Sequence, residues 1–189
     1  MRGGPAVVAV STGRVGAFAR SVTTDQEFAD AYHPLFQASM RLAHRMTRDP
    51  ALAEDIAAEA LARAYARWGQ VREASSPTAW VQRVTANLVI DGARRRKVAT
   101  EAVPLLASED DVLRIEDQVT LRLVLVAALA TLPRRQREAL VLRYLAGVEE
   151  PELSRTLGTS PSSVRTHVQR GLAALRNRLE EHQEVVGRG

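Results

Sequence analysis

The residues with the clearest chemical potential lie on one face of a predicted helix in the C-terminal part of the chain. At 100° per residue, the polar side of this helix carries Ser162, Arg165, Thr166, Gln169 and Arg170. Arg can bind guanine through two hydrogen bonds, Gln can do the same with adenine, and Ser or Thr can contact a base or a phosphate. A helix of this kind fits the major groove of B-DNA. An ordinary solvated amphipathic helix would carry the same residue types, so the neighbouring elements have to decide.

The segment before this helix predicts a second helix and a tight turn. Leu153 and Leu157 give an apolar pattern that ends at Gly158, and Ser160 with Pro161 then provides a cap and a first-turn proline for the next helix. A helix, a glycine turn and a capped helix in this order indicate a helix-turn-helix. DNA binding is therefore the first functional hypothesis.

The composition excludes several other classes of protein. The 189 residues include no Cys, so disulfides, thiol catalysis and Cys-ligated zinc are excluded. The four His show no metal-ligand spacing. The sequence contains no pairing of a nucleophile with a base, no phosphate-binding glycine loop and no paired carboxylates. We therefore predict no metal, no cofactor and no enzymatic activity.

The longest apolar run is too short to cross a membrane. Leu123–Leu132 spans about ten residues, whereas a transmembrane helix needs about 20. At the N-terminus, polar residues interrupt a short Ala/Val run before a secretory signal is complete, so residues 1–23 are expected to form a disordered extension. These features predict a cytoplasmic protein without membrane insertion.

Charge and helix signals divide the chain into two basic modules around an acidic segment. The net charge is +4 over residues 1–96, −3 over 97–131 and +3 over 132–189. Basic modules suit a polyanionic partner, because Lys and Arg release counterions from phosphates. Residues 98–117 hold six acids and one Arg without a sustained period, which is typical of a solvated tether.

The resulting fold prediction is all-α, with two small helical domains joined by an acidic flexible linker. The domains are expected at 24–97 and 118–181, the second containing the helix-turn-helix, with a tail at 182–189. Since the linker offers little apolar surface, we expect the two domains to move relative to each other.

Helix caps divide the N-terminal domain into three helices. A capping box of Thr24 and Glu27 predicts a first helix from about residue 25, with a kink or restart at Pro34. Asp49-Pro50 and Ser76-Pro77 then cap the second and third helices.

The third of these helices is the second candidate for contact with nucleic acid. Arg83, Asn87 and Arg94 lie within about 40° of one another, and the helix ends in the run 94–97, Arg-Arg-Arg-Lys. Cations also favour a helix C-terminus through the helix dipole alone. Four in a row exceed what capping requires, which favours a phosphate contact.

Three blocks of sequence resemble the bacterial RNA polymerase sigma factors of the extracytoplasmic-function (ECF) group, within the sigma-70 family. They are AEDIAAEALARAYARW at Ala53–Trp68, SPTAWVQRVTANLVIDGARR at Ser76–Arg95, and LPRRQREALVLRY at Leu132–Tyr144, followed by the helix-turn-helix. The resemblance covers roughly residues 25–180. It implies that the N-terminal domain recognises and melts the −10 promoter element, that the C-terminal domain recognises the −35 element, and that both are mounted on core RNA polymerase.

The resemblance also assigns roles to individual residues. The −35 set is Ser160, Ser162, Ser163, Arg165, Thr166, Gln169 and Arg170. The −10 set, in a loop that holds a flipped base and on the helix that grips the melted strand, is Ser75, Ser76, Trp80, Arg83, Asn87, Arg94 and Arg95. For Trp80 a core role is favoured over a stacking platform, because it shares the apolar stripe of its helix with Val84.

The remaining implied contacts are with proteins. Asp55, Glu59 and Arg63, called here the polymerase set, match the helix that docks on the largest catalytic subunit, although they could equally form surface salt bridges. Most members of the group are controlled by an anti-sigma factor, so regulation in trans is expected here. The alternative is a stand-alone LuxR-type helix-turn-helix regulator, whose second motif helix also reads V-x-x-H, as residues 164–167 do. Such a regulator would not need the N-terminal domain.

Overall fold

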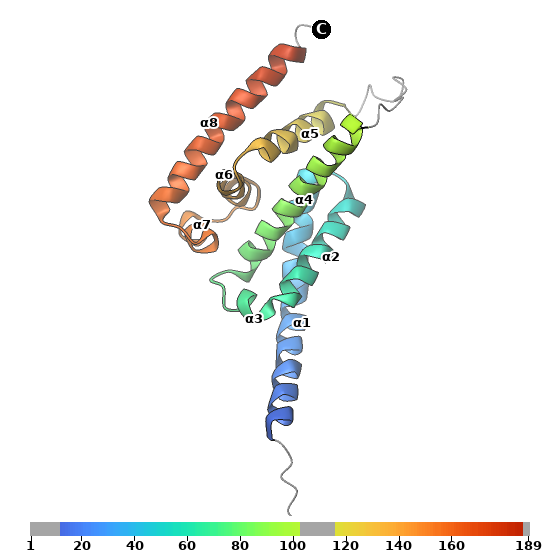
Figure 1. Ribbon diagram of the computed structural model, residues 1–189, viewed down its shortest axis with the longest axis vertical. Coiled ribbons are helices and arrows are strands. Elements are labelled where there is room, and N and C mark those ends of the chain that lie inside the picture. Colours follow the sequence, from blue (N-terminus) through green and yellow to red (C-terminus); the bar gives the residue numbers. More distant parts are fainter. Residues whose placement is uncertain (1–11, 103–115, 187–189) are drawn as a thin grey trace, which may run out of the picture.

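The computed structural model describes the backbone of residues 12–102 and 116–186, and the side chains of residues 24–96 and 122–180. Every element in these ranges is helical, which confirms the all-α prediction (Figure 1). The N-terminal module consists of α1 (Thr12–Thr47), α2 (Pro50–Ala66), α3 (Trp68–Val71) and α4 (Pro77–Ala102). The C-terminal module consists of α5 (Glu116–Thr131), α6 (Arg134–Leu140), the π-helical turn η2 (Val141–Leu145), α7 (Glu150–Leu157) and α8 (Pro161–Val186).

Three of the predicted helix caps are confirmed. The backbone N–H of Leu52 donates to Asp49 Oδ1 at 3.0 Å at the start of α2. In α4 the N–H of Ala79 donates to Ser76 Oγ at 3.1 Å. In α8 the N–H of residue 163 donates to Ser160 Oγ at 3.2 Å. These bonds satisfy helix N–H groups that have no partner within the helix.

The ends of several helices differ from the prediction. α1 begins at Thr12 and continues through Pro34, whereas we expected a disordered extension over residues 1–23 and a kink or restart at the proline; the helix does not restart there. Pro34 is exposed, so its ring lies in solvent while Leu35 beside it is buried, and the missing N–H costs the helix one bond. Residues 1–11 lie outside the described residues.

The linker and the tail also differ in their bounds. α4 runs to Ala102 and α5 begins at Glu116, so both helices enter the segment predicted as a linker, and residues 103–115 lie outside the described residues. α8 continues to Val186, beyond the predicted end of the domain at residue 181. The sequence from 181 to 186 contains neither Gly nor Pro, so nothing local stops the helix.

The N-terminal module has a small core of its own where α1, α2, α3 and α4 meet. Leu35 from α1, Leu61 from α2 and Trp68 from α3 are buried there together with Val81 from α4. The Phe28 ring packs edge-on against Trp68, with the ring centroids 5.2 Å apart. This core fixes the start of α4, the helix that carries most of the −10 set.

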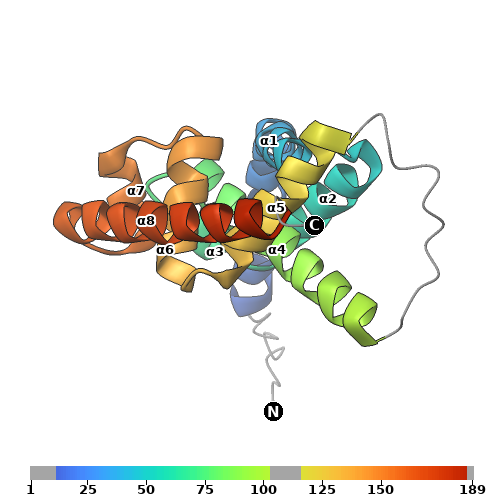
Figure 2. The ribbon, with the colours of Figure 1, turned by 90° about the horizontal axis from the view of Figure 1, so that it is seen from above.

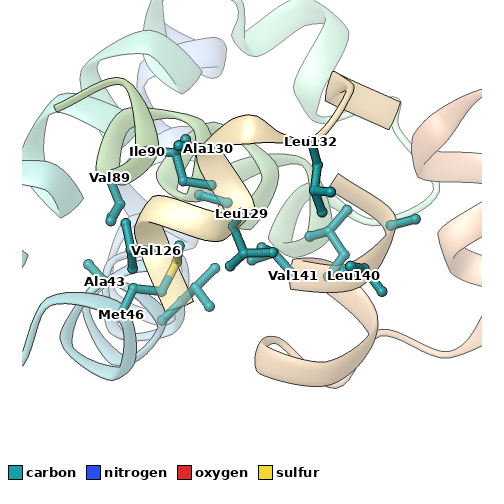
Figure 3. Close-up of a cluster of buried hydrophobic side chains, with 14 of the residues drawn as sticks. Ala43, Met46, Val89, Ile90, Val126, Leu129, Ala130, Leu132, Leu140 and Val141 are labelled. Atoms are coloured by element: carbon teal, nitrogen blue, oxygen red, sulfur yellow. The ribbon is translucent and has the colours of Figure 1, made fainter. Parts of the chain in front are cut away.

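A second and larger core joins the two modules. It contains Leu42, Met46 and Ile90 from the N-terminal module, together with Val126 and Leu129 from α5 and buried residues of α6, η2, α7 and α8. Figure 3 shows α5 placing its apolar side chains between the side chains of α1 and α4 and those of the C-terminal helices. In Figure 2 the helices of the two modules lie side by side.

This arrangement contradicts the expectation that the modules move independently. That expectation considered only the linker, whereas the contact is made by the helices on either side of it. The faces of α4 and α5 that meet are apolar, with Val89 and Ile90 on α4 and Val126 and Ala130 on α5 all buried. Removing these side chains from water favours the closed arrangement.

One glycine permits the close packing of α8 on α6. A Cβ atom added at Gly171 would lie 3.0 Å from Leu140 Cδ1 and 3.3 Å from Gln136 Cβ. A Cβ atom at residue 171 would therefore require its neighbours on α6 to shift by a few tenths of an ångström.

The shared core predicts that the modules unfold together. Leu129→Ala is expected to lower the free energy of unfolding by about 2–5 kcal/mol, because it opens a cavity in that core. Both Trp residues, Trp68 and Trp80, lie in the N-terminal module, so their fluorescence reports that module, while circular dichroism reports both. The urea midpoint of Leu129→Ala should therefore shift by the same amount whether it is measured by Trp fluorescence or by circular dichroism.

The matched control is Leu123→Ala on the same helix, since Leu123 is 61% exposed and should change stability little. If Leu129→Ala shifted the unfolding midpoint measured by circular dichroism but not the midpoint measured by Trp fluorescence, this result would contradict the shared core.

Candidate nucleic-acid interface

The predicted helix-turn-helix is present in α7 and α8. Gly158 ends α7 with a φ of 61°, a left-handed conformation that glycine adopts without strain. The N–H of Thr159 donates to the carbonyl oxygen of residue 154 at 3.0 Å, which closes the turn. Leu153, Leu157 and Val164 are buried between the two helices. The motif is therefore a fixed unit whose second helix has one free face.

The side chains of that free face are available for contact. Within the −35 set, the exposed residues are Ser160, Ser162, Arg165, Thr166, Gln169 and Arg170, and Ser163 is half-buried. At the start of α8, Ser160 Oγ lies 2.9 Å from the hydroxyl oxygens of both Ser162 and Ser163. The structure thus brings the whole −35 set together on the first turns of α8, where helix N–H groups and basic side chains both favour an anion.

An acidic residue that the sequence interpretation did not assign restrains this face. Glu150 Oε1 accepts a hydrogen bond from Arg165 Nη1 at 2.6 Å, and Glu150 Oε2 lies 3.4 Å from Arg143 Nη1. Glu150 therefore holds the Arg165 guanidinium across the motif. The signal available in the sequence was the group of acids Glu149, Glu150 and Glu152 at the start of the first motif helix.

The −10 set lies in the loop before α4 and along α4, and four of its residues contact the C-terminal module. Ser75 Oγ donates to Glu152 Oε1 at 2.8 Å, and Arg83 Nη1 donates to the carbonyl oxygen of residue 156 at 2.8 Å. Asn87 Nδ2 donates to Glu138 Oε1 at 3.0 Å. Arg94 Nε donates to the carbonyl oxygen of residue 130 at 3.0 Å. In the closed arrangement these donors already have protein partners.

The other three −10 residues have different surroundings. Ser76 caps α4, so its hydroxyl serves the backbone. Trp80 is half-buried and packs against the N-terminal core, which supports the core interpretation of this residue while leaving part of its ring accessible. Arg95 is exposed. The predicted −10 set therefore contains residues with a structural role, residues bonded to the C-terminal module, and the exposed Arg95.

Glu138 is the buried acid that organises this interface. Its side chain is 2% exposed, and it lies 2.9 Å from Arg134 Nε and 3.8 Å from Arg135 Nη1, in addition to its bond with Asn87. Burial lowers the pKa of the Arg83 guanidinium, and the charge of Glu138 opposes that shift. Arg nevertheless stays protonated in proteins, so Arg83 remains a cationic donor. Residues 134–138 had been interpreted only as part of a family motif, although their charges signal polar contacts.

The polymerase set lies on α2. Asp55, Glu59 and Arg63 are all exposed, and Arg63 Nε forms the predicted ion pair with Glu59 Oε1 at 2.8 Å. An ion pair at this exposure stabilises the helix by only a few tenths of a kcal/mol, so the two side chains can exchange it for a partner.

The described residues contain neither a candidate metal site nor a candidate membrane span. Within residues 24–96 and 122–180, no group of three or more acidic or His side chains could hold a metal ion. Among the described helices, none is long and apolar enough to cross a membrane.

Both modules match known sequence families. Residues 28–98 match the family described as Sigma-70 region 2, and residues 122–175 match the one described as Sigma-70, region 4. These ranges correspond to the helices from α1 to α4 and from α5 to α8.

Several curated sequences are similar over most of this chain. Identity to the RNA polymerase sigma-E factor of Streptomyces avermitilis is 32% over 157 residues, covering 82% of this chain and 86% of that protein. Identity to the ECF RNA polymerase sigma factor SigL of Mycobacterium tuberculosis is 30% over 149 residues, covering 75% and 82%. Identity to the probable RNA polymerase sigma factor RfaY of Xanthomonas campestris is 29% over 160 residues, covering 78% of this chain but only 39% of that protein.

A solved structure is similar over most of the chain at low identity. The sigma factor RpoE of Bartonella quintana, solved in complex with the anti-sigma factor NepR, aligns with a TM-score of 0.49 and 19% identity. The alignment covers 82% of this chain and 98% of that chain.

The Glu150–Arg165 pair predicts a variant that binds DNA more tightly. Glu150→Gln is expected to raise the affinity of the full chain for duplex DNA by up to about fivefold, because an exposed ion pair stabilises by about 0.2–1 kcal/mol and must be broken to free Arg165. The measurement is fluorescence anisotropy of a labelled duplex at several salt concentrations. Glu149→Gln is the matched control, since it removes the same charge from an exposed neighbour. Equal affinities for the two variants would show that the ion pair does not restrain Arg165.

The Ser75–Glu152 contact predicts a dependence of stability on pH. Hydrogen bonds from Arg155, and less strongly from Ser75 and Thr156, lower the pKa of the Glu152 carboxyl. A carboxyl whose folded pKa lies below its unfolded value stabilises the fold above the unfolded value, and that contribution is lost as the pH falls through the folded pKa. The stability advantage of wild type over Glu152→Gln should be present at neutral pH and shrink at an acidic pH below the ordinary range of a Glu carboxyl, as the pH falls through the lowered folded pKa. Urea midpoints at both pH values measure it, and an advantage that does not change with pH would contradict this assignment.

Proposed function

Because the chain belongs to the sigma-70 family, as an RNA polymerase sigma factor of the ECF group, we propose that it binds core RNA polymerase and directs initiation at promoters with particular −35 and −10 elements. The observation that carries this proposal is the pairing of both sigma regions in one chain, the second of them built around a helix-turn-helix with an exposed polar face. The domains at 24–97 and 118–181 then form the −10 and −35 readers.

We place −35 recognition on the exposed face of α8. Arg165, Thr166, Gln169 and Arg170 supply the donors and acceptors that read base edges in the major groove. The hydroxyl groups of Ser160, Ser162 and Ser163 at the helix start suit a phosphate. The exposure of this face in the closed arrangement supports the assignment.

We place −10 recognition on the loop before α4 and on α4 itself. A flipped base would be held near Ser75 and Ser76, and the strand would run along Arg83, Asn87 and the basic end of the helix. Melting then follows from preferential binding of the open strand, so the protein needs no cofactor and no catalytic residue. Since Ser75, Arg83, Asn87 and Arg94 bond to the C-terminal module, promoter opening requires this contact to separate.

We place core RNA polymerase on the exposed face of α2, through Asp55, Glu59 and Arg63. An anti-sigma factor that covered this face would block polymerase binding, and we propose control of this kind in the cytoplasm, where transcription takes place. Failure to find any inhibitor that blocks core binding would count against this part of the proposal.

The alternative of a stand-alone LuxR-type regulator accounts for less of the chain. It would explain the helix-turn-helix, but it gives no role to residues 28–98, which match Sigma-70 region 2. Such a regulator would bind duplex DNA without polymerase, and this difference separates the two functions.

The test of the proposed function is run-off transcription and co-purification with core RNA polymerase that lacks other sigma factors. Wild type is expected to direct promoter-specific initiation. The double variant Asp55→Arg/Glu59→Arg should lose core binding by more than tenfold, because two attractive contacts become repulsive. Arg165→Ala/Arg170→Ala should keep core binding and lose initiation by more than tenfold, since each base or phosphate contact contributes about 1–3 kcal/mol.

Alanine substitution of two exposed cations outside the sets, Arg41 and Arg176, is the control for lost charge. If wild type does not bind core polymerase but binds duplex DNA, the stand-alone regulator replaces the sigma factor as the proposed function.

A further inference from the structure

A cationic pocket of about 390 Å³ lies between the two modules. It lies beside the contact of α4 with α6. Both modules supply its walls: Arg63, Arg67, Trp80 and Arg83 from the N-terminal module, and Arg134 and Arg137 from the C-terminal module. No function assigned above uses Arg67, Arg134 or Arg137.

Arg137 is the most unusual residue of this pocket. The residue is only 5% exposed, and its Nε and Nη1 atoms are buried without a hydrogen-bond partner. Burial lowers the pKa of this guanidinium, and the nearby charge of Arg94 lowers it further, while Asp91 and Glu138 oppose the shift. A buried cation with free donors is costly unless an acceptor satisfies it.

The charges around the pocket do not balance. Five arginines line it, and the acids in contact are Asp91 in the wall, Glu59 paired with Arg63, and Glu138 paired with Arg134. Two positive charges therefore exceed the negative ones. Because the like charges face one another across the contact between modules, they oppose the closed arrangement that the apolar core favours.

We infer that this pocket binds a small phosphate-bearing anion, such as pyrophosphate or the phosphate groups of a nucleotide, whose oxygens bridge guanidinium groups of the two modules. Several phosphate oxygens can accept from several planar Arg groups at once, a geometry that Arg matches better than Lys does. The volume falls in the range of small-molecule sites, roughly 300–1,000 Å³, and Trp80 gives one wall an aromatic surface.

Such an anion would link the two modules. It would add negative charge beside Arg137 and the other guanidinium groups, neutralise the excess positive charge and so favour the closed arrangement. On the proposed function, Arg83 also contacts the −10 strand, so an occupied pocket and an engaged promoter exclude each other. The binding test below uses neither polymerase nor promoter, so its outcome does not depend on the proposed function.

The experiment titrates the full chain with sodium pyrophosphate at constant ionic strength, with potassium chloride as the balancing salt and without divalent cations. Calorimetry gives the dissociation constant, and thermal unfolding should show a rise in Tm that follows the degree of saturation. Because the chain has no Cys, Glu54→Cys/Ala173→Cys places one dye on each module at exposed positions. Energy transfer between the dyes should increase with pyrophosphate.

Variants on both sides of the pocket test the bridge. Arg67→Gln in the N-terminal module and Arg137→Gln in the C-terminal module should each weaken pyrophosphate binding by about tenfold or more, the loss that one charge-assisted hydrogen bond entails. Arg67 is exposed, so its variant folds even if the buried substitution does not. Arg176→Gln removes an exposed cation outside the pocket and should bind as wild type does.

Parallel titrations with inorganic phosphate and ADP identify the source of the phosphate. Equal affinity for ADP and pyrophosphate would assign the site to the phosphate groups alone, and tighter binding of ADP would add stacking of the base on Trp80. The inference is overturned if pyrophosphate has no effect beyond that of potassium chloride. It is also overturned if Arg67→Gln and Arg176→Gln bind pyrophosphate equally, or if saturation leaves the energy transfer unchanged.

Discussion

The packing of α4 against α5 is the contact on which the rest of the structure depends. Val89 and Ile90 of α4 and Val126 and Leu129 of α5 belong to one buried cluster that extends into the helix-turn-helix. Full burial of a large aliphatic side chain stabilises by roughly 1.5–3 kcal/mol, whereas a hydrogen bond contributes a net of about 0.5–1.5 kcal/mol. The apolar contact therefore decides that the modules lie together, and the polar contacts around it decide how they are aligned.

This alignment gives α4 two mutually exclusive partners. Its polar face donates to the C-terminal module through Arg83, Asn87 and Arg94, and a melted promoter strand would require the same donors. A guanidinium bonded to a carbonyl oxygen cannot use the same N–H groups on a phosphate. On the proposed function, closure of the modules and engagement of the −10 element compete for one set of side chains, while the face of α8 proposed to read the −35 element stays exposed in the closed arrangement.

Two neighbouring charged residues buried at this contact differ in whether their hydrogen-bonding groups have partners. Glu138 is buried and satisfied, since Asn87 and Arg134 both donate to it. Arg137, the preceding residue in α6, is buried with free donors. A closed arrangement with one unsatisfied cation is stabilised less than its apolar core alone would suggest, because the desolvation of that charge opposes it. This balance makes the contact responsive to anions and to substitution.

The sequence alone determined the features that depend on neighbouring residues. The caps at Asp49, Ser76 and Ser160, the glycine turn at Gly158 and the apolar stripe of α8 are local, because each requires residues only a few positions apart. The family motifs are local in the same sense, and they identified the family before any contact was known. The helix ends were less accurate, since the continuation of α1 through Pro34 depends on packing at both sides of the proline.

Only the tertiary structure decided what the polar side chains face. Ser75 meets Glu152, and Asn87 meets Glu138, across 77 and 51 residues of sequence. The pairing of Arg165 with Glu150 and the burial of Arg137 likewise depend on how helices pack. An Arg or Asn on a helix face is compatible with solvent, nucleic acid or protein, and its type and spacing are the same in each case. The choice among them was made by the apolar faces of α4 and α5, which bring the two modules together.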